Sequence, residues 1–315
     1  MRTEVDPVTV PQVFLPLVGL VLFLALWLPA SLFAHEGPEH EIEELTALIE
    51  AGRGDFETYL ERAIEYRVLG KLAEAQRDLE QAIRMNPGSL PALRELARIQ
   101  FVEGKTTEAI ATVNQALRLN IEEPADHGSL LVQRAEMLRS QGHFRRALKD
   151  CDEAVRVHGG NPEWYLLRSD LQRRLKLHRK RIDDLDEGLK QTGAGILAIE
   201  KIEAQLDAGQ FKTALKAIEP ELASARLRAG WLVRRGRARL GIGDKMGGAE
   251  DLRAALKEID TRLDRARPDS SLLLDQAIAH VLLGDRPAAL QTYELARNKE
   301  AGEEMTERIR QWVHP

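Results

Sequence analysis

The sequence predicts an all-α protein built as an array of about seven helical hairpins. The first observation is a glycine followed five residues later by an alanine, a pair that recurs at intervals of roughly 34 residues or multiples of them. The second is a composition with 43% hydrophobic but only 5% aromatic residues, which together with abundant alanine, leucine, glutamate and arginine is typical of helical proteins. The pairs are Gly70/Ala75, Gly104/Ala109, Gly142/Ala147, Gly209/Ala214 and Gly284/Ala289, with Gly243/Gly248 as a variant.

The charge balance argues against a nucleic-acid-binding protein. The chain has a formal net charge of −5 at pH 7 and a pI of about 6.0, whereas nucleic-acid-binding proteins present a basic surface to the phosphates. Its single cysteine, Cys151, excludes an intrachain disulfide framework. An array in which each unit contacts only its neighbours has no fixed upper length, so 315 residues suit this architecture.

Residues 1–34 differ in composition from the rest of the chain and predict an export signal. Residues 13–28 are uncharged and mostly Leu, Val and Phe, and small residues then precede a polar stretch that begins at His35. This order predicts either a signal peptide cleaved after Ala34 or a retained membrane anchor, because the apolar run is shorter than a span of about 20 residues. In both cases we expect an exported protein, periplasmic or anchored outside the cytoplasm. A membrane contact is expected only through an uncleaved N-terminal segment.

The remaining chain divides into three expected parts. Residues 35–55 are expected to form a polar leader and a first helix, and residues 56–299 the array of hairpins. Residues 300–315 predict a last helix, because Met305, Ile309 and Trp312 recur at helical spacing. In a repeat array such a helix covers the exposed apolar face of the last unit.

The first clear hairpin shows how each unit is built. Residues 56–68 and 72–84 predict two helices, and Gly70 between them can take the left-handed conformation that ends a helix. Pro87 stops the second helix, because proline lacks the amide hydrogen that a continuing helix needs. The apolar face of this helix, at helical period, consists of Ala75, Leu79, Ala82 and Ile83.

Three small residues recur in register in four units. They are Ala63, Ala75 and Ala82 in the first unit, Ala97, Ala109 and Ala116 in the second, Ala135, Ala147 and Ala154 in the third, and Ala277, Ala289 and Ala296 in the last. This pattern resembles the tetratricopeptide repeat family, over about residues 56–300. The resemblance implies a right-handed superhelical α-solenoid that holds protein or peptide partners in a concave groove.

The middle units depart from the pattern. In the fourth, Ser169, Arg181 and Gly188 stand at the small positions, and Lys176 replaces the glycine between the helices. The fourth unit also holds the densest basic run, residues 173–181, which the acidic residues 183–187 follow directly. We expect this run to form a solvated face of internally paired charges, with a partner-binding surface as the alternative. In the sixth unit, glycines at two small positions should lower helix stability.

The family's groove positions carry a set of arginines in this sequence. The resemblance implies a partner-binding groove lined by Arg94, Arg98, Arg139, Arg173, Arg174, Arg234 and Arg237. An arginine stripe can take carboxylates of a peptide through bidentate hydrogen bonds. Acidic residues interrupt the stripe, so we expect a groove of mixed charge. The lysine and asparagine with which one chaperone-binding subgroup grips a C-terminal carboxylate are absent from the equivalent positions.

A histidine pair near the predicted cleavage site gives a second functional hypothesis. Cleavage after Ala34 would make His35 the N-terminal residue, with both an α-amine and an imidazole, and His40 follows closely. Nitrogen ligands of this kind suit Cu(II). The alternatives are a periplasmic copper-handling protein and a solvated leader without metal.

We therefore predict a non-enzymatic scaffold with a protein or peptide partner, no nucleic acid and no required cofactor. The carboxylates and histidines of the chain form no constellation that supports catalysis. Cys151 falls at a position that the repeat fills with a large buried apolar side chain, so we expect a buried, unreactive thiol.

Overall fold

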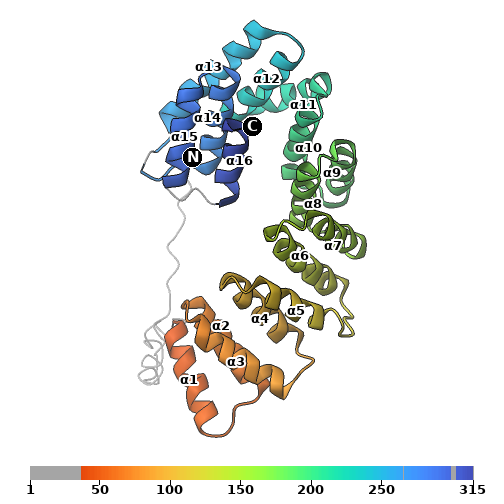
Figure 1. Cartoon of the computed structure of the whole chain (residues 1–315), viewed down its shortest axis with the longest axis vertical. Coiled ribbons are helices and arrows are strands. Elements are labelled where there is room, and N and C mark those ends of the chain that lie inside the picture. Colours follow the sequence, from red (N-terminus) through yellow and green to blue (C-terminus); the bar gives the residue numbers. More distant parts are fainter. Residues whose placement is uncertain (1–36, 265, 299–302, 315) are drawn as a thin grey trace, which may run out of the picture. The chain divides into compact units, whose positions relative to one another are not determined.

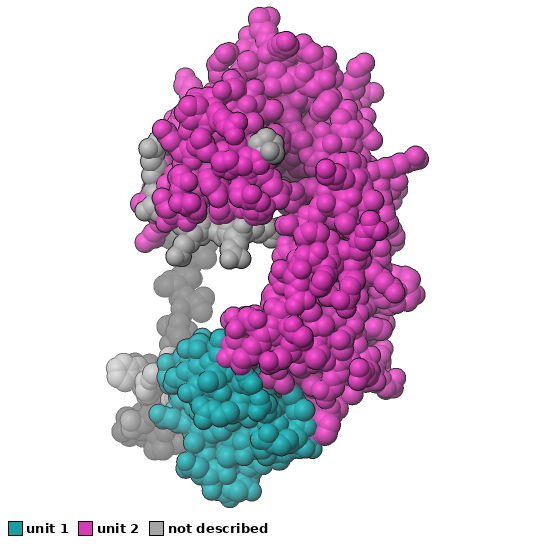
Figure 2. All heavy atoms as spheres, in the orientation of Figure 1, with its two compact units in different colours: residues 1–85 teal, residues 86–315 magenta. Residues whose placement is uncertain are grey.

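The computed structural model describes residues 37–264, 266–298 and 303–314, so the predicted export signal lies outside the described residues. The described part forms sixteen α-helices and contains no β-strand, which confirms the all-α class. None of these helices is both long and apolar enough to span a bilayer. Two compact units, residues 1–85 and 86–315, make up the chain (Figure 2).

The first unit consists of α1 (Pro38–Glu50), α2 (Phe56–Val68) and α3 (Leu72–Met85). α2 begins at a capping box in which the Asp55 carboxylate accepts the Thr58 amide at 2.9 Å. Arg62 on α2 donates to both carboxylate oxygens of Asp78 on α3, at 2.7 and 2.8 Å. Its remaining nitrogen donates to Thr46 on α1 at 3.0 Å. One guanidinium therefore joins all three helices of this unit.

The second unit contains six hairpins and a last helix (Figure 1). The hairpins are α4 (Leu90–Val102) with α5 (Thr106–Ala116), α6 (Pro124–Ser140) with α7 (Phe144–Val157), α8 (Pro162–Arg174) with α9 (His178–Thr192), α10 (Gly195–Asp207) with α11 (Phe211–Ser224), α12 (Ala229–Gly241) with α13 (Lys245–Arg262), and α14 (Ser270–Leu282) with α15 (Arg286–Asn298). The last helix is α16 (Glu303–Val313). From α6 onward the first helix of each hairpin also contacts the first helix of the next hairpin. Together with α2 and α3, these elements make the seven hairpins that the sequence predicts.

A left-handed residue ends the first helix of every hairpin. Six of these residues are glycines, with φ between 71° at Gly209 and 91° at Gly243. In the fourth hairpin Lys176 takes the position with φ 57°, and it is the only described non-glycine residue with positive φ. A Cβ atom strains this conformation by about 1 kcal/mol or more, so the turn between α8 and α9 forms at a cost that the other turns avoid.

Small residues lie where the two helices of a hairpin come closest. Ala63 and Ala75 are 1% and 0% exposed, which explains why the repeat keeps small side chains there. In the sixth hairpin glycines stand at these positions in place of alanines, and Gly236 on α12 faces Gly248 on α13. A Cβ added to Gly236 would lie 3.0 Å from the carbonyl oxygen of Gly248 and 2.9 Å from Leu252. These glycines are therefore required by close packing of the two backbones.

The last helix packs on the last hairpin. α16 contacts both α14 and α15, and it buries Ile309 and Val313 in a cluster with Leu273, Ala277 and Ala289. The helix thus covers apolar surface that α14 and α15 would otherwise expose. Two other side chains of α16, Gln311 and Trp312, contact Arg173 on α8 and Arg237 on α12.

Candidate partner-binding groove

The seven arginines predicted for the groove all lie on first helices of hairpins in the second unit. Two are on α4, one on α6, two on α8 and two on α12. We call the surface formed by α4, α6, α8, α10 and α12 the first-helix face. Each of the seven guanidiniums lies within 4 Å of a carboxylate of the same unit. The arginines therefore form ion pairs within the protein, and the face has the mixed charge that the sequence indicates.

Asp170 on α8 brings together three of these arginines. Its carboxylate lies 2.5 Å from Arg173, 2.8 Å from Arg174 and 3.5 Å from Arg139 on α6. Burial alone would raise the pKa of Asp170, but hydrogen bonds and charge from Arg174 and Arg173 lower it below its usual value. The Arg174 guanidinium also stacks over the Phe144 ring, 5.3 Å from its centroid. These contacts fix the arginines of α8 in place.

The arginines of α12 pair with acidic residues of α10. Arg234 lies 2.8 Å from one oxygen of Glu203, and Arg237 lies 3.3 Å from the other. Arg237 also donates to Asp207 at 2.6 Å. Burial raises the pKa of Asp207, whereas Arg237 and Arg181 lower it by a larger amount, so the carboxyl stays ionised.

Arg181 explains the departure of the fourth unit from the small-residue pattern. Its side chain, only 1% exposed, donates to Ser169 at 2.8 Å, to Glu200 at 2.6 Å and to Asp207 at 2.6 Å. The prediction of a solvated face for the whole basic run is therefore wrong for Arg181. The prediction of a solvated, paired charge is correct for Lys180, which is exposed and lies 2.7 Å from Asp184, one turn further along α9.

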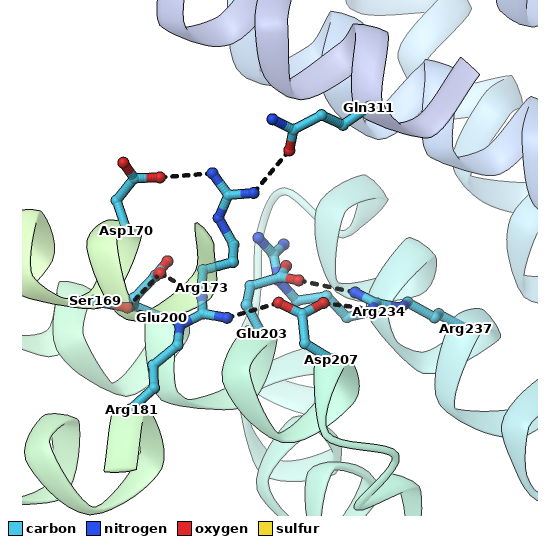
Figure 3. Close-up of polar contacts among 10 residues, drawn as sticks. All are labelled: Ser169, Asp170, Arg173, Arg181, Glu200, Glu203, Asp207, Arg234, Arg237 and Gln311. Carbon is cyan, nitrogen blue, oxygen red and sulfur yellow. Dashed lines mark hydrogen bonds and ion pairs between the residues drawn. The ribbon is translucent and has the colours of Figure 1, made fainter. Parts of the chain in front are cut away.

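These contacts form two neighbouring groups of side chains, which Figure 3 shows and which we together call the α8–α12 network. Asp170 and Arg173 make up one group, and bonds from Ser169 through Arg181 and Asp207 to Arg237 connect the other. Its members are Ser169, Asp170, Arg173, Arg181, Glu200, Glu203, Asp207, Arg234 and Arg237. Four arginines and four carboxylates belong to the network, and Arg139 and Arg174 bring two more positive charges to Asp170. Each arginine of the network already has a carboxylate partner, and such pairing holds the side chains in one geometry.

Helix α16 reaches the α8–α12 network from the far end of the unit. Arg173 donates to the side-chain oxygen of Gln311 at 2.8 Å, across 138 residues of sequence (Figure 3). The Arg237 guanidinium lies over the Trp312 ring, 4.9 Å from its centroid. Arg310 and Gln311 donate to Glu307, and the pKa of this carboxyl falls to about 2, mainly through its bond to Arg310. α16 thus covers part of the first-helix face at α8 and α12.

Nearer the start of the second unit, the first-helix face contains an open hollow. The hollow, of about 310 Å³, lies among α4, α6 and the beginning of α8. Its lining comprises Arg94, Arg98, Phe101, Ser129, Val132, Gln133, Glu136, Met137, Asn161, Glu163 and Trp164. Only two of these residues, Arg94 and Arg98, belong to the predicted site. The remaining lining residues do not belong to the predicted site, because only the arginines at the groove positions of the repeat were expected to bind a partner.

A second motif escaped the sequence analysis, although its spacing is visible there. An arginine on the first helix pairs with an aspartate sixteen residues later on the second helix. The pairs are Arg62–Asp78, Arg134–Asp150 and Arg235–Asp251, each with two hydrogen bonds, and Arg168–Asp184 at 3.5 Å. Each of these arginines directly precedes the first small residue of its hairpin. The pairs hold the two helices together, so they serve the hairpin and not a ligand.

The structure bears on only half of the proposed copper site. His35 lies outside the described residues, whereas His40 is on α1, where its Nε2 atom lies 3.3 Å from Glu44. Within the described ranges, no three His, Cys, Asp or Glu side chains are grouped so that they could hold a metal ion. Cys151 on α7 is fully buried, and burial raises the pKa of its thiol far above the usual value.

Comparisons with known proteins agree with the fold. A model of the tetratricopeptide repeat matches residues 60–124. A tetratricopeptide repeat protein from Parabacteroides merdae has a similar structure, with a TM-score of 0.62 and 16% identity over 82% of this chain and 99% of that chain. The APC/C hetero-tetramer Cut9–Hcn1 matches with a TM-score of 0.50 and 14% identity, over 88% of this chain and 46% of that chain. No curated protein sequence matches. At these identities, the structural likenesses establish the fold alone.

Proposed function

Because this chain is a tetratricopeptide-repeat protein, we propose that it is a non-enzymatic scaffold that binds a protein or peptide through its first-helix face. The observation that carries this proposal is the hollow among α4, α6 and α8, on the face where first helices lie side by side. Its lining offers guanidinium, carboxylate, amide and aromatic groups within one small region. Such a set suits recognition of a polypeptide.

The mechanism is binding to a surface that is arranged in advance. Ion pairs such as Arg94–Asp126 at 2.9 Å hold groove side chains in position before a partner arrives. The α8–α12 network does the same for its arginines. Association then orders fewer side chains, which reduces the entropy lost on binding.

Site-specific photo-crosslinking tests this proposal. A benzophenone amino acid replaces Val132, which lines the hollow, and in a second variant it replaces Arg179, which is exposed on α9. Crosslinking is carried out in the native host, and the adducts are identified by mass spectrometry. We expect a discrete adduct from position 132 and none from position 179. Adducts from position 179 alone would place the interface on the second helices and overturn the proposal.

We further propose that the scaffold acts outside the cytoplasm. The support is the uncharged run of residues 13–28 followed by small residues up to Ala34. N-terminal sequencing of the mature protein from membrane and periplasmic fractions tests this proposal. A mature protein that starts at His35 indicates cleavage, whereas an intact chain in the membrane fraction indicates an anchor. An intact chain in the cytoplasmic fraction would contradict both forms.

The copper-handling alternative depends on the same cleavage, because only a free N-terminus gives His35 an α-amine ligand. Titration calorimetry with Cu(II) on the mature protein, with His40→Ala as a matched variant, tests this alternative. Binding that weakens in the variant supports it. Absence of heat from the mature wild-type protein rules it out.

A further inference from the structure

The hollow on the first-helix face is lined by arginines on one helix and by glutamates on two others. The inference drawn from this lining rests on the scaffold function proposed above. We propose that the hollow binds an extended peptide segment that presents a carboxylate to Arg98 on α4 and a basic side chain to Glu163 on α8. All residues that line the hollow belong to the second unit.

The wall formed by α4 is cationic. Arg94 and Arg98 both line the hollow, whereas their ion-pair partners, Asp126 and Glu95, do not. Arg98 has the more exposed side chain, at 54%, and its pair with Glu95 is loose, with 3.3 Å between the closest atoms. The pair is exposed on the Arg98 side, so a partner carboxylate can join the guanidinium there while the contact with Glu95 stays in place.

The opposite wall is acidic. Glu163 and Glu136 line it, from α8 and α6, and both residues are exposed. Glu163 lies in the first turn of α8, and the Asn161 side chain caps this helix by accepting the Glu163 amide at 2.9 Å. The cap fixes the backbone of Glu163 at the rim of the hollow, and its side chain remains accessible to a basic group.

Uncharged polar groups of the lining suit an extended backbone. Ser129 and Gln133 on α6 and Asn161 before α8 also line the hollow, and the Gln133 side chain already bonds a main-chain oxygen, that of Arg94 at 3.1 Å. An extended segment directs its amides sideways toward such groups, whereas a helix satisfies its own amides internally. Trp164 and Met137 are buried and form an apolar base for a side chain of the segment.

The α8–α12 network is a poorer site for the same peptide, although it contains more arginines. Arg173 and Arg237 are both bonded to carboxylates and are also in contact with α16. A peptide would have to displace these partners. The contrast between the open hollow and the closed network makes the proposal specific to α4, α6 and α8.

Peptide selection with the full mature chain tests the proposal. A phage-displayed library of random dodecapeptides is selected on the immobilised protein, and the binders are synthesised with a fluorescent label. We expect sequences that combine an acidic and a basic residue. Replacing the peptide's acidic residue by its amide should weaken binding to the wild-type protein about fivefold, and the loss should disappear in Arg98→Gln. The basic residue should show the same coupling to Glu163→Gln.

One matched control and one competing variant accompany the test. Arg179→Gln alters an exposed arginine outside the hollow and should leave the affinity unchanged. Arg173→Gln alters the α8–α12 network, the competing part of the first-helix face; circular dichroism verifies that every variant is folded. An affinity that responds to Arg98→Gln but not to Arg179→Gln supports the hollow as the site. Binding lost only in Arg173→Gln, a lack of coupling to Arg98 and Glu163, or a library without binders overturns the inference. The scaffold function fails separately, through the crosslinking result at positions 132 and 179.

Discussion

The Nη1 atom of Arg173 on α8 lies 2.8 Å from the Oε1 atom of Gln311 on α16, which joins the middle of the second unit to its last helix. The same guanidinium bonds Asp170 through its other terminal nitrogen. Arg173 therefore links α16 to the half-buried carboxylate of Asp170 on its own helix, α8. The C-terminal helix is a structural part of the first-helix face, beyond its role of covering α14 and α15.

Removal of the Gln311 side-chain amide tests this link. We expect Gln311→Ala to lower the free energy of unfolding by about 1 kcal/mol, since a half-buried hydrogen bond to a charged group is lost. Hydrogen exchange should accelerate at the amides of α16 and not at those of α4. Gln81→Ala is the matched control, because Gln81 also accepts bonds from an arginine, Arg84, but at an exposed site. Equal changes in the free energy of unfolding in the two variants would show that the bond to α16 contributes no more than an exposed arginine–glutamine bond.

Restoring the repeat's preferred alanine at position 181 should be harmful. Arg181→Ala removes the shared donor of Ser169, Glu200 and Asp207 and leaves two half-buried carboxylates with fewer partners. We expect a loss of about 3–5 kcal/mol, measured by urea unfolding. Arg179→Ala, on the exposed side of the same helix, should change stability by about 0.5 kcal/mol or less. Should Arg181→Ala match or exceed the wild-type stability, the network would be dispensable.

Two glycine-to-alanine substitutions should have opposite effects. At Gly236 a new Cβ would meet Leu252 at 2.9 Å and the Gly248 carbonyl at 3.0 Å, so Gly236→Ala should destabilise the protein by about 1–3 kcal/mol. At Gly195, the first residue of α10, no atom lies within 4 Å of the added Cβ. Gly195→Ala should therefore stabilise by about 0.4–1 kcal/mol. Thermal melting of both variants provides the measurement, and a stabilising Gly236→Ala would contradict the close packing of α12 and α13.

Acid should weaken the second unit through Asp170 and Asp207. The folded protein lowers the pKa of both carboxyls below 3.8, the value of an unperturbed aspartate, so their contribution to stability is fully present above that pH. It is lost as the pH falls through the lowered folded values. Urea midpoints should therefore decline below about pH 4. Asp207→Asn should be less stable at pH 7 but lose less on acidification, and parallel pH profiles for the two proteins would contradict this account.

The Cys151 thiol should be inert in the folded protein. It is completely buried on α7, and its pKa is raised well above the usual value, so little thiolate is present at neutral pH. A thiol reagent such as Ellman's reagent should react with Cys151 only after unfolding in urea. Rapid reaction of the native protein would show that the cluster around α7 opens readily.

The sequence determined the hairpins, because the features that build them are local. The turn glycine, the apolar face and the small residues recur along the chain, and each acts within one hairpin or on its neighbour. The three-residue pattern at Ala63, Ala75 and Ala82, for example, corresponds to buried contacts in the structure. The groove arginines could also be placed on first helices from register alone.

Only the tertiary structure decided which arginines are available to a partner. Arg181 appeared in the sequence as part of an exposed basic run, yet it pairs with Ser169, Glu200 and Asp207 from helices α8 and α10. The Arg173–Gln311 bond joins residues that no repeat spacing relates. Ion pairing depends on distances between side chains from different helices, and a one-dimensional pattern does not contain those distances. The repeats therefore follow from the sequence, whereas the open hollow beside Arg98 and the closed network at Arg181 follow from how the helices pack.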